Sequence, residues 1–291
     1  MKRFHVILGA LLVFILAFSA FAQEAAQAQQ DSTVEAQKLF NEGLTLLKRG
    51  KSTDAIQKLN ESVAKDPNLA VSYYVLGIAY KMQKDYGKAE NMFKTAIDKD
   101  PKMSDAYNAL GLLYAGEEKY NEAINTFQAA INANPNDEKA NFGMGYVYIQ
   151  KKDYRNAIQY FQKAVEVKPD YSKAWLNLGV SQYQIKQYTE AVNSFENALK
   201  SETKKTEKGD IYLRLGDAYS KEGSDAKAIE AYDNALQTAT KSYIKAAANF
   251  GLGEIYKNKG EKQKAIAYYQ AASRDRSWKQ SALYEIDLLK K

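Results

Sequence analysis

Small and large apolar residues recur along the chain with a period of 34 residues, which lengthens to 37 near the C-terminus. Each period has a glycine, followed by an alanine after twelve residues, a large apolar residue after sixteen and a small residue after nineteen. The glycines are Gly43, Gly77, Gly111, Gly145, Gly179, Gly216 and Gly253. The large residues are Leu59, Phe93, Phe127, Phe161, Phe195, Tyr232 and Tyr269. This repetition indicates seven copies of one structural unit.

The spacing within a unit predicts two antiparallel helices that cross closely. A glycine inside a helix costs about 1 kcal/mol relative to alanine, so its return in every unit requires a packing reason. Small residues at the glycine and alanine positions let the two helices approach, and the large residue fills the space beside the crossing. The small residue at the last position leaves room for the next unit. Each unit is therefore predicted to be a helical hairpin, and the chain to be all-α.

Prolines and tyrosines mark the expected ends of these helices. Four prolines lie 24 residues after their glycines, where a proline ends the second helix: Pro67, Pro101, Pro135 and Pro169. Four tyrosines follow short polar turns, where the second helix is expected to begin: Tyr86, Tyr120, Tyr154 and Tyr188. Because such tyrosines recur with the period, we interpret them as packing residues rather than ligand-binding residues.

Leucine precedes five of the glycines, as in Leu76-Gly77, and a tyrosine such as Tyr80 follows five of them after three residues. With the period and the prolines, these positions resemble the tetratricopeptide repeat (TPR) family. The resemblance covers 36–279 and implies a right-handed superhelical solenoid of stacked helix-turn-helix repeats, whose first helices line a concave groove. The implied repeats span 36–69, 70–103, 104–137, 138–171, 172–205, 209–242 and 246–279, followed by a C-terminal capping helix over 280–291.

Some units depart from the common pattern. The first unit is degenerate, with Glu42 before its glycine and Ser52 where later units have tyrosine, as expected of a terminal cap. The fifth and sixth units lose the closing proline and gain three residues each, around 201–208 and 238–245. We expect a longer second helix or a looser turn there. Trp278 is expected to anchor the capping helix.

The N-terminus has the order of a secretory signal peptide. Lys2 and Arg3 precede an apolar run, and Ala20-Phe21-Ala22 precedes Gln23 as a cleavage site would. We therefore expect a signal peptide over 1–22, a flexible leader over 23–35 and an exported, periplasmic or secreted protein. The alternative is an uncleaved inner-membrane anchor, because the apolar run would almost span a bilayer.

Composition argues against an enzyme. The chain has no cysteine, and its one histidine, His5, lies in the expected signal peptide. The commonest transition-metal ligands and general base are thereby missing from the expected mature chain, so we predict no catalysis, metal or cofactor. The formal net charge is +6, but lysines alternate with acidic residues. This distribution is typical of a solvated surface, and we expect no nucleic-acid partner.

The resemblance implies that function resides in the concave groove. An apolar, aromatic stripe there predicts a site for a protein or peptide partner. The expected groove residues are Tyr74, Ile78, Phe142, Tyr146, Ile149, Leu176, Val180 and Tyr183. The stripe continues through Leu213, Asp217 and Ser220 to Phe250, Glu254 and Lys257. The alternative is that neighbouring units bury these side chains.

Some TPR proteins grip an acidic chaperone tail through Lys and Asn residues in the groove. Phe40 and Leu44 stand at the corresponding first-unit positions, so we expect no such clamp. The sequence therefore predicts a non-enzymatic scaffold of the cell envelope that binds partner proteins. A membrane-anchored envelope assembly factor is the alternative.

Overall fold

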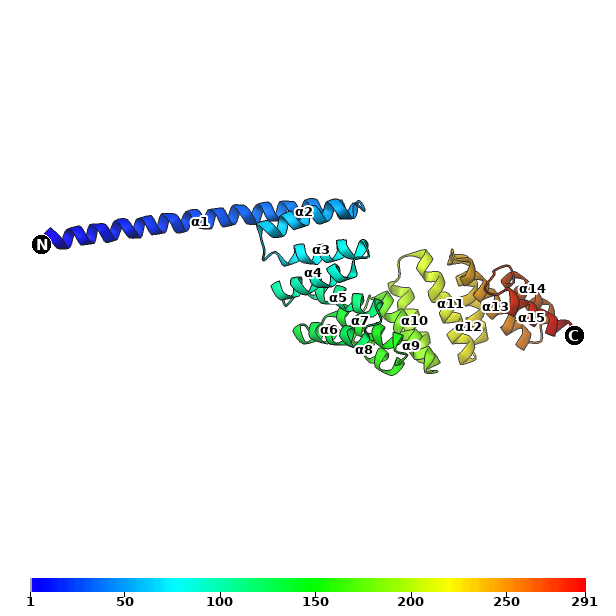
Figure 1. The fold of residues 1–291 in the computed structure, drawn as a ribbon. Coiled ribbons are helices and arrows are strands. Elements are labelled where there is room, and N and C mark those ends of the chain that lie inside the picture. Colours follow the sequence, from blue (N-terminus) through cyan, green and yellow to red (C-terminus); the bar gives the residue numbers. More distant parts are fainter. Residues whose placement is uncertain (1) are drawn as a thin grey trace. The chain divides into compact units, whose positions relative to one another are not determined.

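The computed structural model describes the backbone of residues 2–291 and the side chains of residues 23–291 except residue 25. All regular elements in this part of the chain are helices (Figure 1). They are α1 (Lys2–Lys48), α2 (Ser52–Lys65), α3 (Ala70–Met82), α4 (Tyr86–Lys99), α5 (Ser104–Gly116), α6 (Tyr120–Ala133), α7 (Glu138–Gln150), α8 (Tyr154–Val167), α9 (Ser172–Gln184), α10 (Tyr188–Ser201), α11 (Lys205–Glu222), α12 (Asp225–Thr238), α13 (Ser242–Asn258), α14 (Lys262–Ala272) and α15 (Lys279–Lys290). The predicted all-α fold is confirmed.

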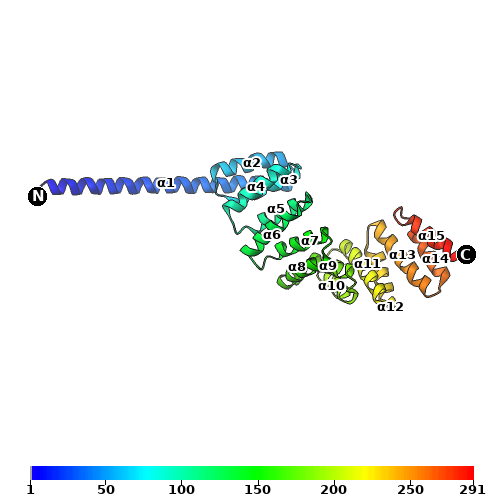
Figure 2. The same ribbon diagram turned by 60° about the horizontal axis from the view of Figure 1, so that its bottom comes forward.

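The chain divides into two compact units, residues 1–119 and residues 120–291. In the first unit, α1 pairs with α2 and α3 with α4, and α5 packs on the second hairpin. In the second unit the hairpins are α7–α8, α9–α10, α11–α12 and α13–α14, each packed on the next (Figure 2). Helix α6 packs on α7, and α15 packs on α14. The helices of the repeat expected over 104–137 thus belong to different units.

Helix ends fall where the prolines and tyrosines predict. Tyr86, Tyr120, Tyr154 and Tyr188 are the first residues of α4, α6, α8 and α10. Each proline lies two residues beyond the end of α2, α4, α6 or α8. Because proline disfavours the helical conformation of the residue before it, the chain leaves the helix there.

Close helix crossing at the periodic glycines is also confirmed. A Cβ atom on Gly77 would lie 2.5 Å from the Phe93 ring, which comes from the other helix of the same hairpin. The same distance would be 2.6 Å between Gly179 and the Phe195 ring. Real Cβ atoms do not approach a ring this closely, so the glycine makes room for the aromatic side chain in the hairpin.

The turns between the first and second helix of each repeat share one backbone geometry. Lys84, Glu118, Lys152 and Lys186 have positive φ angles of 59° to 65°, and Gly50, Gly223 and Gly260 occupy the same position in other hairpins. The next residue bonds back to the preceding helix, as where the Asp85 N–H donates to the Tyr80 carbonyl (3.0 Å). This is the left-handed C-terminal helix cap that normally favours glycine.

The three extra residues of the fifth and sixth units lengthen neither the second helix nor the turn. Helices α10 and α12 have 14 residues, like α4, α6 and α8. Instead, α11 has 18 residues and α13 has 17, against 13 in α9. The expectation was wrong because the added residues extend the N-terminus of the following first helix. In α11 this extra turn packs at Gly209 against Ala239, close enough that a Cβ on the glycine would lie 2.6 Å from the Ala239 Cα.

The N-terminal segments were expected to be processed or irregular. The predicted signal peptide over 1–22 lies outside the side chains that the structure describes. Residues 23–35, expected as a flexible leader, are helical and belong to α1. Their Ala, Gln and Glu residues are strong helix formers, and Ser32 donates to the Lys65 carbonyl of α2 (2.8 Å). Among the described residues, no helix is long and apolar enough to cross a membrane.

The last helix covers the end of the second unit, as predicted. Ala282 and Ile286 of α15 are buried against Tyr269 and Ala272 of α14. The Trp278 ring, just before α15, lies 4.9 Å from the Phe250 ring of α13. Trp278 therefore anchors the helix, as the sequence indicated.

Candidate functional site

The first helices of the hairpins carry the candidate binding residues. In the second unit α7 contacts α9, α9 contacts α11 and α11 contacts α13, so these first helices form one continuous layer. The second helix of each hairpin packs against its own first helix. We call the face that the layer of first helices presents, with Tyr146, Tyr183, Asp217 and Glu254, the inner face.

Two of the predicted groove residues, Tyr74 and Ile78, lie on α3 in the first unit. Both are half-buried and pack against the cluster around Leu59 and Val75. The Tyr74 ring lies 6.1 Å from the Phe93 ring of α4. These side chains therefore help to hold their own hairpin together.

Three more of the predicted residues, Phe142, Tyr146 and Ile149, lie on α7 in the second unit. Phe142 is half-buried, with its ring 5.6 Å from the Phe161 ring and 5.1 Å from the Tyr171 ring. Ile149 is half-buried against the same cluster. Tyr146 is 38% exposed and is the most accessible of the three side chains.

The remaining predicted residues, Leu176, Val180 and Tyr183, lie on α9. All three are half-buried and pack against the core cluster that contains Phe195. The Tyr183 ring meets the Tyr188 ring edge-on at 5.3 Å. Burial and the nearby Asp217 carboxylate raise the pKa of the Tyr183 hydroxyl, so it stays protonated at neutral pH.

A pocket opens on the inner face where α9, α11 and α13 meet. Its volume is about 470 Å³, and Trp278 and Tyr232 also border it. Tyr183 is the predicted groove residue that lines it, with Leu213, Ser220 and Phe250 as further wall residues. A narrower recess of about 220 Å³ lies beside it, between Val180 and Arg214. The hollow part of the inner face therefore lies at the C-terminal end of the expected stripe.

The pocket wall also carries five charged side chains, of which the expected stripe included only Asp217 and Glu254. They are Asp210, Arg214, Asp217, Lys221 and Glu254. A signal for two of them was present. The residue after the periodic glycine is apolar or aromatic in the first five units and acidic, Asp217 or Glu254, in the last two.

Each of these two acids is held by a tyrosine of the second helix in its own hairpin. The Tyr232 hydroxyl donates to Asp217 Oδ1 (2.8 Å), and the Tyr269 hydroxyl donates to Glu254 Oε1. Gly251 leaves room for the first pair, since a Cβ there would lie 2.7 Å from the Tyr232 hydroxyl oxygen. The tyrosines thus fix two carboxylates at the inner face.

Burial dominates the electrostatics of Asp217. It raises the pKa of the Asp217 carboxyl to about 6, against the opposing effects of the Tyr232 hydrogen bond, Arg214 and Lys221. Arg214 itself is held by Asp210, with its Nε 3.0 Å from Asp210 Oδ2. Asp217 is still mainly ionised at neutral pH, so the pocket wall carries a partly desolvated negative charge.

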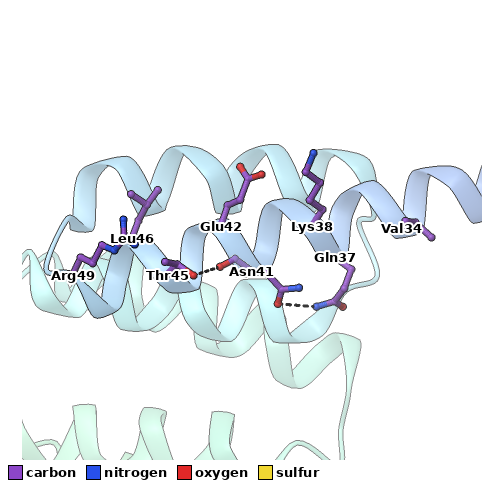
Figure 3. Close-up of a pocket in the computed structure, with 8 residues that line it drawn as sticks. All are labelled: Val34, Gln37, Lys38, Asn41, Glu42, Thr45, Leu46 and Arg49. Atoms are coloured by element: carbon purple, nitrogen blue, oxygen red, sulfur yellow. Dashed lines mark hydrogen bonds between the residues drawn. The ribbon is translucent and has the colours of Figure 1, made fainter.

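A second concave surface lies on the outer side of α1. Figure 3 shows the eight residues that border it, of which seven, including Val34 and Asn41, lie on α1 and the last, Arg49, directly follows the helix. Gln37 Nε2 lies 3.5 Å from Asn41 Oδ1, and Thr45 Oγ1 donates to the Asn41 carbonyl (2.8 Å). Since no second element closes this surface, it is an open helix face rather than an enclosed site.

The described side chains do not gather three or more His, Cys, Asp or Glu residues in a group that could hold a metal ion. On the inner face, aromatic side chains lie beside carboxylates that are held in position by hydrogen bonds. Such a surface recognises side chains by shape and charge.

Stacked hairpins with an inner layer of first helices define a helical repeat protein of the solenoid class. The chain belongs to the tetratricopeptide repeat family, because a model of that family matches residues 40–104, 176–243 and 213–280, more than half of the chain. A second tetratricopeptide repeat model matches residues 80–141. The model of subunit 3 of the anaphase-promoting complex (cyclosome) matches residues 116–198. The family fold is that of a protein-interaction scaffold.

Solved structures share the fold at low sequence identity. The C-terminal part of a TPR protein from Cytophaga hutchinsonii is 21% identical with a TM-score of 0.67, and the match covers 84% of this chain and 98% of that one. PilF from Pseudomonas aeruginosa is 21% identical with a TM-score of 0.61, covering 74% and 97%. YrrB, described as a TPR protein with an unusual peptide-binding site, is 20% identical with a TM-score of 0.50, covering 62% and 91%. A comparison with curated proteins gives no match.

Proposed function

We propose that this protein is a non-enzymatic scaffold that binds a protein or peptide partner on the inner face of the second unit. The observation that carries the proposal is the inner face itself, where an exposed Tyr146 and the pocket beside Tyr183 lie on one continuous layer of first helices. Apolar and aromatic surface of this kind is typical of sites that take up a peptide or helix. The described peptide-binding site of YrrB, which shares the fold, is in keeping with this function.

We further propose that the protein works in the cell envelope. The order of Lys2, Arg3, the apolar run and Ala20-Phe21-Ala22 supports export with cleavage before Gln23. N-terminal sequencing of the protein recovered from its native cells tests this proposal. We expect Gln23 as the first residue, whereas Met1 or Lys2 would favour the alternative of a membrane-anchored assembly factor.

Partner capture by Tyr146→Asp tests the binding site. The substitution places a charge on the inner face at a side chain with exposed surface, so we expect it to weaken partner binding while helicity by circular dichroism stays unchanged. The matched control is Tyr284→Asp, because Tyr284 is 63% exposed and lies on α15, outside the layer of first helices.

The measurement is a pull-down with the wild-type chain and both variants, analysed quantitatively by mass spectrometry. Proteins retained by the wild type and by Tyr284→Asp, but lost from Tyr146→Asp, are partners of the inner face. Equal recovery of every protein by all three chains would move the binding site away from Tyr146.

A further inference from the structure

The last two hairpins differ from the others at one pair of positions. In the other repeats the large residue of the second helix is leucine or phenylalanine and the residue after the periodic glycine is apolar or aromatic, as with Phe195 and Val180. In the last two, tyrosine replaces phenylalanine and an acid replaces the apolar residue, giving Tyr232 with Asp217 and Tyr269 with Glu254. The two changes occur together, so the position after the periodic glycine turns from apolar to acidic in α11 and α13.

These carboxylates are fixed in position but only partly satisfied. The Tyr232 hydroxyl bonds one oxygen of Asp217, and no further hydrogen-bond donor to this carboxylate is found among the described residues. An ionised carboxylate offers about four acceptor positions, so most of the acceptor capacity of Asp217 faces the pocket. A partly desolvated carboxylate held by a tyrosine is suited to a charge-assisted hydrogen bond from a ligand.

The charge balance of the pocket is opposite to that of the chain. The pocket wall carries Asp210, Asp217 and Glu254 with Arg214 and Lys221, a net charge of about −1, whereas the whole chain carries +6. Arg214 is bound to Asp210, and Lys257 bonds both Glu254 (2.8 Å) and Glu285 (2.9 Å). Lys221 lies one helical turn from Asp217 and acts on its carboxylate, so the surplus negative charge belongs to the group of Asp217, Glu254 and Glu285 as a whole.

Aromatic rings complete the surroundings of these acids. Tyr183, Tyr243, Phe250 and Trp278 line the same pocket. Lysine and arginine side chains combine an apolar stem with a charged head, and they pack on aromatic faces while bonding carboxylates. The pocket thus matches both parts of such a side chain.

We propose that the pocket between α9, α11 and α13 recognises a lysine or arginine side chain of the partner segment, with Asp217 as the main carboxylate and Glu254 as the second. This inference rests on the proposed function and names the chemistry of the partner. The stem of the basic residue lies against the rings of Tyr183, Phe250 and Trp278, and its charged head bonds Asp217.

Binding of peptide pools to the immobilised full chain tests the proposal. Three pools of acetylated, amidated eleven-residue peptides have randomised flanks and a central residue fixed as arginine, leucine or glutamate. At low salt and pH 7.5 the arginine pool is expected to be retained about tenfold more than the leucine pool, which corresponds to about 1.4 kcal/mol. Retention of the glutamate or leucine pool equal to that of the arginine pool overturns the proposal.

Asp217→Asn is the deciding variant, since the amide keeps one acceptor oxygen for Tyr232, while the charge is lost and the second oxygen becomes an NH2 donor. It is expected to abolish the preference for arginine and to leave retention of the leucine pool unchanged, with an undiminished melting temperature as the check on folding. The control Asp287→Asn removes an exposed acid on α15 and is expected to keep the preference. An undiminished preference in Asp217→Asn overturns the proposal.

The experiment separates this inference from the function on which it rests. Equal retention of the arginine and leucine pools, with loss of both in Tyr146→Asp, keeps the peptide-binding scaffold and removes only the recognition of a basic residue. Retention of no pool by the wild-type chain contradicts both.

Discussion

At the scale of single residues, burial decides the chemistry of the inner face. Asp217 sits beside Tyr232 in a wall that excludes much of the water, and its pKa rises to about 6. An acid with a raised pKa binds its proton more tightly in the folded chain than in the unfolded chain. Ionising Asp217 therefore lowers the stability of the fold, and this cost is present above pH 6 and disappears as the pH falls toward 4.

The stability of Asp217→Asn is expected to depend on pH relative to wild type. At pH 7.5 the variant avoids the cost of the buried charge, so its free energy of unfolding should exceed that of wild type by an amount on the order of 2 kcal/mol. The advantage should shrink at pH 4.5, where the wild-type carboxyl has bound its proton. Urea unfolding of both chains at the two pH values measures the change, and a difference independent of pH would contradict it.

Lys152 gives a second prediction at this scale. Its φ angle of 59° is a conformation that costs a residue with a side chain about 1–2 kcal/mol, although glycine adopts it freely. Lys152→Gly should therefore raise the free energy of unfolding by about 0.5–1 kcal/mol after the added flexibility of the unfolded chain is subtracted. Lys151→Gly, at the neighbouring residue with a φ of −77°, is the control and should not stabilise the chain.

At the scale of elements, the hairpins α3–α4, α7–α8, α9–α10, α11–α12 and α13–α14 each depend on a glycine of the first helix and a ring of the second. The contact joins residues 16 positions apart, so it is local in sequence, and in α1–α2 a leucine, Leu59, takes the place of the ring beside Gly43. The tyrosine and acid pairs of the last two hairpins use the same contact, with the hydroxyl added at the edge of the ring. The hydrogen bonds between tyrosines and acids at the inner face thus depend on the same contact between a glycine and a large side chain that the other hairpins also have.

Gly77→Ala tests this contact. A methyl group there meets the Phe93 ring at 2.5 Å, and overpacking of this kind costs about 1–3 kcal/mol. Gly87→Ala is the matched control, because Gly87 lies in α4 of the same unit with no atom within 4 Å of its added methyl group. The control should leave stability unchanged or raise it by up to about 1 kcal/mol, and equal chemical-denaturation midpoints for the two variants would refute the packing role.

At the scale of the whole molecule, each hairpin is stabilised mainly by its own contacts and by those with its neighbours. In the second unit, α15 supplies the missing neighbour of the last hairpin. In repeat proteins the stability is roughly a sum of contributions from each unit and from each interface between neighbouring units. A substitution that destabilises the terminal unit should therefore affect the adjacent units first and more distant units later.

Ile286→Ala is expected to loosen this end first. The side chain is 4% exposed and packs under α15, so its truncation should cost about 2–4 kcal/mol of local stability. Amide hydrogen exchange should accelerate in α13–α15 before it changes in α7–α10. Leu288→Ala on the same helix, where the side chain is 47% exposed, should have little effect. Uniform acceleration across the second unit would contradict local coupling.

The sequence by itself determined the hairpin repeats, their helix ends and the glycine–ring contacts. These features depend on residues close in sequence, such as Gly77 with Phe93 or Pro101 after α4, so their pattern is readable along the chain. The sequence did not predict that the first helices α11 and α13 are longer, because the extra residues could extend either the helix before the turn or the helix after it. Packing of Gly209 against Ala239 is part of the fold that places them in α11.

Only the tertiary structure decided where the inner face is hollow and charged. The pocket needs side chains from α9, α11 and α13, whose distance across the face is set by packing and not by the repeat pattern. The paired change of Phe to Tyr and of an apolar residue to an acid is visible in the sequence. The effect of this change on the pKa of Asp217 cannot be seen in the sequence, because the pKa is raised by burial among residues of neighbouring helices.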